Sequence, residues 1–435
     1  MSKPQGINVI GYVSGNLGLA VAARSTISRL LAWRHPVAVV DVDPGAGRMG
    51  HDTAFASLEC PGVCPHHINV FHLNPPEVIS FSKQWVSHAS VHATNVCVPF
   101  WELPHLPLDW LPIVGMMDLV MAPTHFIREA IEKDLPDVRI VDFPQTVTIP
   151  EGVQPDRARW DIADDVVTFL VTFEPASDTA RKNPWGAVEA FQRAFPTDEG
   201  VALLIKLNRG GVAANRTEDL QRLEAAAKAD ARIHVFEERL SYVDVLSLYS
   251  SVDAIVSLHR AEGLGLHLME AMSMGKPVIA TGWSGNMDFM THDNSCLVGY
   301  DFVRVRSNNP SYRTEGERPE QVWAEPNVDE AANWMLRLVA DPALRLSIGE
   351  RAKESMRSWT EAANATSPFL AIPKVIDPEW SPKRLRNHAS FAYMVTPRIQ
   401  QQVRDSKRRI KSVKRRLRSV KRRVGSALRA MGLRN

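Results

Sequence analysis

Two glutamates, Glu262 and Glu270, stand eight positions apart in a glycine-containing segment of this 435-residue chain. Glu262 is followed by Gly263 and Gly265 in a predicted loop, whereas Glu270 falls inside the helix that comes next. Glycines before a helix let backbone N–H groups approach a phosphate or a sugar oxygen, and carboxylates accept hydrogen bonds from hydroxyls. The alternative is that Glu262 only stabilises the N-terminus of the helix through the helix dipole and that Glu270 is a surface residue. Because apolar residues flank Glu270 on both sides, we favour a site for hydroxyls and phosphate together.

The elements that must hold this loop alternate between short apolar runs and helices. In the first half of the chain, strands are predicted at residues 7–12, 37–41, 69–72, 95–98, 119–121 and 139–141. In the second half, strands are predicted at residues 166–171, 201–207, 233–236, 254–258, 277–280 and 296–298. Short apolar strands separated by helices imply parallel sheets that are covered on both faces. Two successive doubly wound units leave a ligand cleft between the carboxyl ends of their strands.

The length of the chain also favours two domains, because single cores stop growing well below this size. We place α/β domains of the Rossmann type at residues 1–160 and 161–360. A proline-containing connector follows at residues 361–397, and a basic amphipathic helix is predicted at residues 398–435.

The overall composition is that of a soluble globular protein, with 45% hydrophobic and 23% charged residues. The four cysteines are too few for a disulfide framework, and the N-terminus lacks the apolar core of a signal peptide. No run of 18 apolar residues suggests a membrane-spanning helix. We therefore expect a cytoplasmic protein.

The basic segment at residues 398–435 contains fifteen Lys or Arg residues and one acidic residue, so it carries a charge of +14. The rest of the chain carries −12. Apolar or small residues recur along the segment at alternating spacings of three and four, which predicts one helical stripe surrounded by cations. Such a helix suits an anionic membrane surface. Self-association and an acidic partner are alternatives, whereas nucleic acid is disfavoured because no aromatic residues are interleaved with the cations.

The segment from Leu258 to Phe289 resembles the E-x7-E signature of family-4 retaining glycosyltransferases, which are group 1 enzymes of the GT-B type. Its two glutamates correspond to Glu262 and Glu270, and the sequence GKPVIAT at residues 275–281 is also typical of that family. The run SGNMDF at residues 284–289 resembles a bacterial subgroup that makes surface polysaccharides, some members of which use GDP-mannose. The similarity extends over residues 169–352 and is weaker in the N-terminal half.

The resemblance implies the GT-B fold, with two Rossmann-like domains facing each other across a cleft. The C-terminal domain is expected to hold the nucleotide-sugar donor and the N-terminal domain the acceptor. Glu262 is expected to contact hydroxyls of the donor sugar, and Glu270 the ribose hydroxyls. The backbone amides expected to face the sugar and the diphosphate belong to Gly263, Leu264, Gly265 and Leu266. Gly15 would stand in the glycine-containing first loop at the border of the cleft.

A basic pair neutralises the leaving diphosphate in that family, and Lys182 matches its lysine. The arginine normally lies six positions earlier, where this chain has Ala176. Arg181, Lys206 or Arg260 could supply the second cation. A merely solvated Arg181–Lys182 pair is disfavoured because basic residues at a helix N-terminus oppose the helix dipole.

The acceptor side offers Glu102, His72 and Asn74 as candidates, since they lie at or after the ends of predicted strands of the first domain. Glu102 could equally pair with a cation, and a lone histidine is more often structural. Two metal-like patterns, the D-x-D at Asp41 and the C-x3-C-x-H-H that begins at Cys60, are declined, so no metal site is predicted.

We therefore predict a retaining, metal-independent hexosyltransferase without a cofactor, with mannose as one candidate sugar. It would transfer the sugar from a nucleoside-diphosphate donor to a glycan or lipid-linked acceptor, as a peripheral protein on the inner face of the cell membrane. The alternatives are a sugar-nucleotide 2-epimerase, which shares the fold, and a catalytically silent binding subunit, which the alanine at position 176 favours.

Overall fold

The protein is described by a computed structural model. The described residues are 5–43, 52–60, 64–78, 93–207, 218–238, 240–312 and 320–372. Within these ranges no helix is long and apolar enough to cross a membrane. The basic segment at residues 398–435 and most of the predicted connector lie outside them.

The N-terminal half folds around a six-stranded parallel sheet with the strand order β2-β1-β3-β4-β5-β6. Its strands are β1 (Ile7–Gly11), β2 (Val37–Asp41), β3 (Ile68–His72), β4 (Thr94–Cys97), β5 (Leu119–Ala122) and β6 (Ile140–Asp142). The helices of this half are α1 (Gly18–Ala32), α4 (Leu111–Val114) and α5 (His125–Asp134). The four central strands are buried along their whole length, as expected for a sheet covered on both faces.

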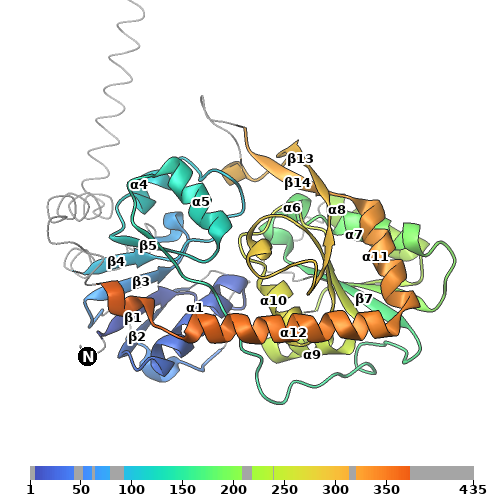
Figure 1. The fold of residues 1–435 in the computed structure, drawn as a ribbon, viewed down its shortest axis with the longest axis horizontal. Coiled ribbons are helices and arrows are strands. Elements are labelled where there is room, and N and C mark those ends of the chain that lie inside the picture. The colour runs from blue at the N-terminus through green and yellow to red at the C-terminus, as the bar shows by residue number, and fades with distance from the viewer. Residues whose placement is uncertain are drawn as a thin grey trace, which may run out of the picture.

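The C-terminal half repeats this plan with the strand order β12-β11-β10-β7-β8-β9 (Figure 1). Its strands are β7 (Val167–Phe173), β8 (Val201–Leu207), β9 (Ile233–Phe236), β10 (Ala254–Ser257), β11 (Val278–Thr281) and β12 (Cys296–Val298). The helices are α6 (Thr179–Lys182), α7 (Pro184–Ala194), α8 (Glu218–Ala229), α9 (Tyr242–Ser251), α10 (Leu266–Ser273), α11 (Val328–Ala340) and α12 (Pro342–Asn364). The predicted pair of doubly wound parallel sheets is confirmed.

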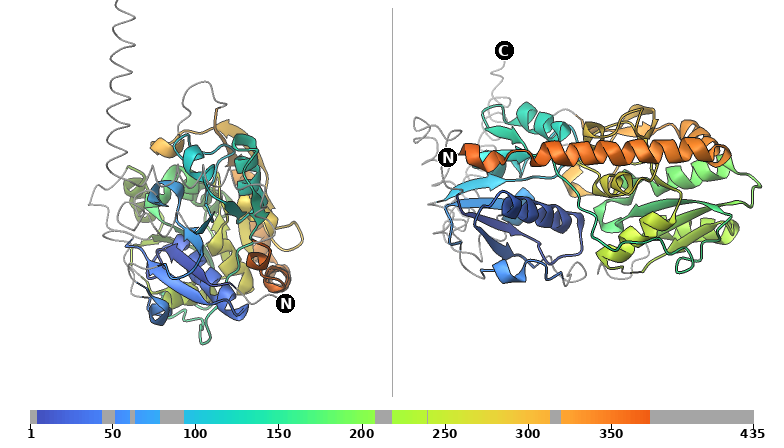
Figure 2. Two further views of the ribbon diagram at one scale, coloured as in Figure 1. Left: turned by 90° about the vertical axis from the view of Figure 1, so that its left-hand side faces the viewer. Right: turned by 60° about the horizontal axis from the view of Figure 1, so that its bottom comes forward.

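Two features were not predicted. An antiparallel hairpin of β13 (Tyr300–Arg304) and β14 (Val322–Pro326) belongs to the second half, and its Val303 and Trp323 pack against the core of the first domain. The long helix α12 runs through the predicted boundary at residue 360 and extends along the second half until its end reaches the first (Figures 1 and 2).

The end of α12 is bonded to the first domain. Arg29 Nη2 donates to the carbonyl of Ala363 at 2.7 Å, and Trp33 Nε1 donates to that of Asn364 at 2.8 Å. The short helix η5 (Pro368–Ala371) then places Phe369 edge-on against Phe143 in the core of the first domain. The last described residues therefore fasten the second half of the chain to the first.

Candidate functional site

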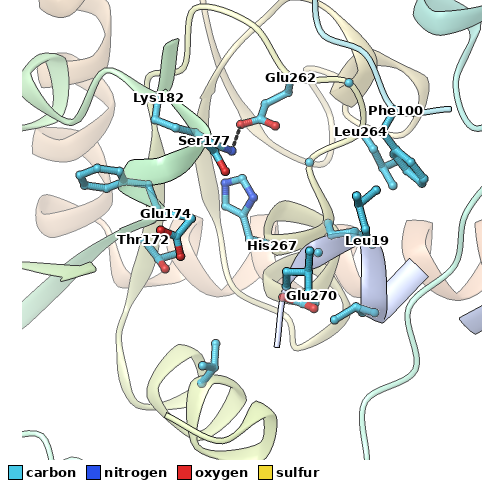
Figure 3. Close-up of a pocket in the computed structure, with 18 of the residues that line it drawn as sticks. Leu19, Phe100, Thr172, Glu174, Ser177, Lys182, Glu262, Leu264, His267 and Glu270 are labelled. Carbon is cyan, nitrogen blue, oxygen red and sulfur yellow. Dashed lines mark hydrogen bonds and ion pairs between the residues drawn. The ribbon is translucent and has the colours of Figure 1, made fainter. Parts of the chain in front are cut away.

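A cavity of about 400 Å³ lies between the two sheets, where the carboxyl ends of their strands meet. The first domain lines it with residues 16–19 before and within α1, with Asn74 after β3, and with Phe100 and Glu102 after β4. The second domain lines it with the ends of β7 and β8, one side of α9, and the loop from Glu262 into α10 (Figure 3). The predicted cleft therefore contains the glutamate motif.

Glu262 lies at the inner end of this loop and is almost completely buried. Its backbone N–H donates to Ser284 Oγ at 2.9 Å, which fixes the loop. Its carboxylate forms an ion pair with Lys182 and lies 3.4 Å from Nη1 of Arg181. Burial alone would raise the pKa of Glu262, but Lys182 and Arg181 outweigh it and hold the pKa well below its usual value. Glu262 is therefore a carboxylate that faces the cavity beside a lysine.

Arg181 lies behind this pair and does not line the cavity, in contrast to Lys182. Its guanidinium donates to the carbonyls of Ala261 at 2.8 Å and of Ser177 at 3.0 Å. It also lies 3.5 Å from a carboxylate oxygen of Glu102, so it connects the two domains. Only 3% of Arg181 is exposed, and the expectation that it contacts a ligand directly is not supported by this position.

Of the other two candidates for the second cation, one lines the cavity and the other does not. Arg260 points away from the cavity, because its Nε and Nη2 donate to the carboxylate of Glu325 at 2.6 and 2.7 Å. Lys206, at the end of β8, lines the cavity. Burial lowers the pKa of Lys206 to about 8, and the nearby Glu174 opposes that shift. Of the three candidates, only Lys206 lies where a ligand would be.

Glu270 lies in α10 on the same wall as Glu262 and is also buried. Tyr242 Oη, at the start of α9, donates to its carboxyl group at 3.0 Å. Burial raises the pKa of Glu270 to about 7, although the bond from Tyr242 and the charge of Arg24 oppose the shift. Arg24 also donates to the carbonyls of Val13 and Gly15 and so orders the first loop. Gly15 itself does not line the cavity, whereas residues 16–18 do.

Glycines are required where the loop passes the first domain. A Cβ atom on Gly263 would lie 2.6 Å from the carbonyl oxygen of Trp101. The Thr124 hydroxyl, which caps α5, donates to the carbonyl of Gly263 at 2.9 Å. Gly265 has a φ of +89° and is the N-cap of α10, a conformation that side chains with a Cβ rarely adopt. The loop is thus held between both domains by its backbone.

We expect Gly263→Ala to lower the thermal unfolding temperature and to weaken ligand binding. The added methyl group must displace the backbone at Trp101, and such overpacking costs about 1–3 kcal/mol. Gly200→Ala is the matched control, because its Cβ would face only the end of the Asp198 side chain at 3.3 Å. Equal unfolding temperatures for the two variants would show that the loop does not need this close approach.

The sequence of the second domain matches a known family over its central part. Residues 187–304, which include both glutamates, match the family model described as "Glycosyl transferases group 1". This part of the chain is therefore similar to group 1 glycosyltransferases. No curated protein sequence matches the chain.

Solved structures identify the fold of the whole. Sucrose-phosphate synthase from Thermosynechococcus elongatus aligns with 83% of this chain and 96% of its own, at 15% identity and a TM-score of 0.57. HepE from Anabaena, solved in complex with UDP and glucose, aligns with 87% of this chain and 100% of its own, at 13% identity and a TM-score of 0.58. The chain therefore has the predicted GT-B fold.

Not all of the acceptor-side candidates line the cavity. Glu102 and Asn74 line the cavity, and Tyr312 Oη donates to Glu102 at 3.3 Å. His72 does not line it, because its ring is fully buried at the end of β3. Burial, together with Arg29, lowers the pKa of His72 to about 3. His72 is therefore a neutral core residue, and its proposed contact with an acceptor is not supported.

No group of metal-ligating side chains occurs within the described ranges. Asp41, the first acid of the D-x-D pattern, instead accepts a hydrogen bond from the backbone N–H of Ser14 at 3.1 Å. This bond fixes the turn that leads to α1.

Several residues that line the GT-B cleft were missed by the sequence analysis: Asn16, Leu17, Leu19, Glu174, Tyr242, Tyr249 and His267. His267 stands inside the glutamate motif, and Glu174 follows directly after β7, so the position of each was a usable signal. Nothing in the local sequence pointed to Tyr242, which reaches Glu270 from a neighbouring helix.

Proposed function

We propose that this GT-B protein is a glycosyltransferase that moves a hexose from a nucleoside-diphosphate sugar to a glycan or lipid-linked acceptor. The observation that carries the proposal is the cavity wall, which has Glu262 and Lys182 at one end and Glu270 at the other (Figure 3). Tyr242 also lines the cavity and donates to Glu270. The sugar and the ribose of such a donor need hydrogen-bond acceptors for their hydroxyls, and the diphosphate between them needs cations. The group 1 domain at residues 187–304 supports the same activity.

The roles we propose are those that the resemblance implies. Glu270 binds the ribose hydroxyls, and Glu262 binds hydroxyls of the donor sugar. Lys182, with Lys206 as the second cation, stabilises the diphosphate. The backbone amides of residues 263–266, which lead into α10, would face the sugar and the diphosphate.

In the proposed reaction an oxygen of the acceptor bonds to the anomeric carbon while the bond from that carbon to the diphosphate breaks. The acceptor approaches on the face that the leaving group vacates, which retains the configuration, and its proton passes to the departing diphosphate oxygen. We assign no nucleophile to the protein and no metal or cofactor to the reaction. The protein contributes binding, orientation and charge stabilisation.

The finer assignments rest on the sequence resemblance. We propose a family-4 enzyme of the bacterial surface-polysaccharide subgroup, with mannose as one candidate sugar. The domain at residues 161–360 would bind the donor, and the domain at residues 1–160 the acceptor through Glu102 and Asn74. Residues 361–397 would connect them to the basic segment.

The ionisation of Glu270 gives a pH prediction. Its carboxyl group, with a pKa of about 7, is mostly protonated at pH 6 in the free protein. Ribose hydroxyls stabilise the carboxylate, so binding lowers the pKa and releases a proton. We expect nucleotide affinity to rise about tenfold between pH 6 and pH 8 and then to level off. Calorimetric titration measures this, and Glu270→Gln should remove the dependence; an unchanged profile in Glu270→Gln would contradict the assignment.

The basic segment at residues 398–435 gives a membrane prediction. Each cation near an anionic surface adds about 1 kcal/mol, so we expect sedimentation with vesicles that contain anionic lipid and release by salt. A chain that ends before Pro397 should stay in solution and retain donor binding. Equal sedimentation with neutral and anionic vesicles, or with and without the segment, would contradict a peripheral location on the inner face of the membrane.

The test of the proposed activity is product analysis. The protein is incubated with UDP-glucose, UDP-galactose or GDP-mannose, and the products are analysed by NMR for a new glycosidic bond or for slow donor hydrolysis. An α-configured product or sugar supports retention. A 2-epimeric sugar would instead indicate the epimerase, and an unchanged donor with measurable binding would indicate a silent binding subunit.

A further inference from the structure

A row of four polar side chains, three of them buried and the last half-buried, leads from the interior of the second domain to the cavity wall. Asn286 Oδ1 lies 3.1 Å from His259 Nε2, and His259 Nδ1 lies 3.0 Å from Ser257 Oγ. Ser257 Oγ lies 3.4 Å from Nε2 of His267. The His267 ring lines the cavity between the Lys182–Glu262 pair and Glu270 (Figure 3).

The first bond of the row fixes the position of a proton. Asn286 Nδ2 donates to the carbonyl of Thr281 at 3.1 Å, so the oxygen of the amide must be the atom that faces His259. An amide oxygen only accepts, and therefore His259 Nε2 carries a hydrogen. The carbonyl of Trp283, at 3.4 Å from the same nitrogen, is a second acceptor and requires the same tautomer.

This tautomer fixes the donor and the acceptor of the remaining hydrogen bonds in the row. Burial lowers the pKa of His259, so its ring is neutral and its Nδ1 holds a lone pair. Ser257 has one hydroxyl hydrogen, which it donates to this nitrogen. The Ser257 oxygen is then an acceptor, and His267 must donate to it from Nε2.

His267 is thereby left with a lone pair on Nδ1. Burial, with the charge of Lys182, lowers the pKa of His267 to about 3, although Glu262 opposes the shift, so the ring stays neutral. None of the hydrogen bonds found among the described residues involves Nδ1, and this nitrogen is not enclosed by protein. An acceptor at the cavity wall, between the sites assigned to the sugar and to the ribose, suits a hydroxyl group.

We infer that His267 is a specificity-determining residue whose Nδ1 accepts a hydrogen bond from a hydroxyl of the donor sugar. This inference rests on the proposed function. Ser257, with His259 and Asn286 behind it, acts as a positioning residue because it fixes the tautomer. A donor that lacks the hydroxyl at this point would leave the nitrogen unpaired and would be rejected.

The tautomer is tested without any ligand. In the ¹⁵N-labelled full chain, two-bond nitrogen–proton correlations at pH 7 should show both His259 and His267 protonated at Nε2 and bare at Nδ1. Ser257→Ala should leave His259 unchanged and give His267 a mixture of tautomers. A hydrogen on Nδ1 of His267 in the parent protein would overturn the inference.

The sugar contact is tested by measuring the affinities for UDP-glucose, UDP-galactose and GDP-mannose in titrations. Each is compared with the affinity for UDP or GDP alone. For the donor that the parent binds, His267→Phe should weaken binding about tenfold and leave the affinity for the free nucleotide within about twofold. An aromatic ring stays in place, whereas the acceptor for the sugar and the bond to Ser257 are lost. His292→Ala, at an exposed histidine of the same domain, is the matched control and should match the parent. Equal losses for sugar donor and free nucleotide, or no loss, would overturn the contact. A parent that binds none of the donors overturns the proposed function and the contact together, while the NMR result still stands.

Discussion

Lys182→Ala should lower the turnover number about 100-fold or more, with a smaller effect on donor affinity. Lys182 is the cation of the Glu262 pair that faces the cavity, and charge develops on the diphosphate as it leaves. Removing one preorganised partner of such a charge typically costs a factor of about 100 to 1,000 in rate. Initial rates of donor turnover at saturating donor measure the effect.

Two comparisons make this prediction specific. Lys353→Ala removes an exposed lysine of α12 and should leave the rate unchanged. Lys206→Ala should also reduce the rate, because Lys206 lines the same cavity. If Lys182→Ala kept the parent rate while Lys206→Ala lost most of it, Lys206 and not Lys182 would be the cation that stabilises the leaving group.

Arg181→Ala should instead act mainly on stability and lower the free energy of unfolding by about 3–5 kcal/mol. The substitution leaves the buried carboxylate of Glu262 with one cation fewer and removes the cation that pairs with Glu102 across the domains. Removing one member of a buried ion pair typically has a cost of that size. Urea unfolding followed by tryptophan fluorescence measures the change, and the loss of activity should follow the loss of folded protein.

Arg193→Ala is the matched control for this variant. Arg193 pairs with Glu189 and Asp329 on the surface, where about half of its side chain is exposed. An exposed pair contributes at most about 1 kcal/mol, so this variant should unfold close to the parent. If Arg181→Ala were as stable as Arg193→Ala but inactive, Arg181 would contact the ligand after all.

The sheets were predictable because their strands are short apolar runs that must be buried on both faces. The glutamate motif was predictable for a similar reason, since a glycine-containing loop beside an acid among apolar residues is typical of a ligand site. The hairpin of β13 and β14 and the crossing of α12 depend on contacts between distant segments, such as Arg29 with Ala363. No local pattern encodes such contacts.

The different positions of Arg181 and Lys182 could not be predicted from the local sequence. Arg181 and Lys182 are neighbours in α6, yet only Lys182 lines the cavity, because the carbonyls of Ala261 and Ser177 hold the guanidinium of Arg181. His72 differs for another reason, because it stands at the end of β3 near the cavity but its ring is completely buried inside the first domain.

The most direct test of a donor site between the two glutamates is calorimetric titration of the parent and of Glu270→Ala with UDP-glucose and GDP-mannose. A lost hydrogen bond to a charged group is worth about 1.5–3 kcal/mol, or about tenfold or more in affinity. We predict that the parent binds at least one of these donors and that Glu270→Ala binds it at least about tenfold more weakly. Equal affinities in the two proteins, or no binding of either donor by the parent, would contradict the site.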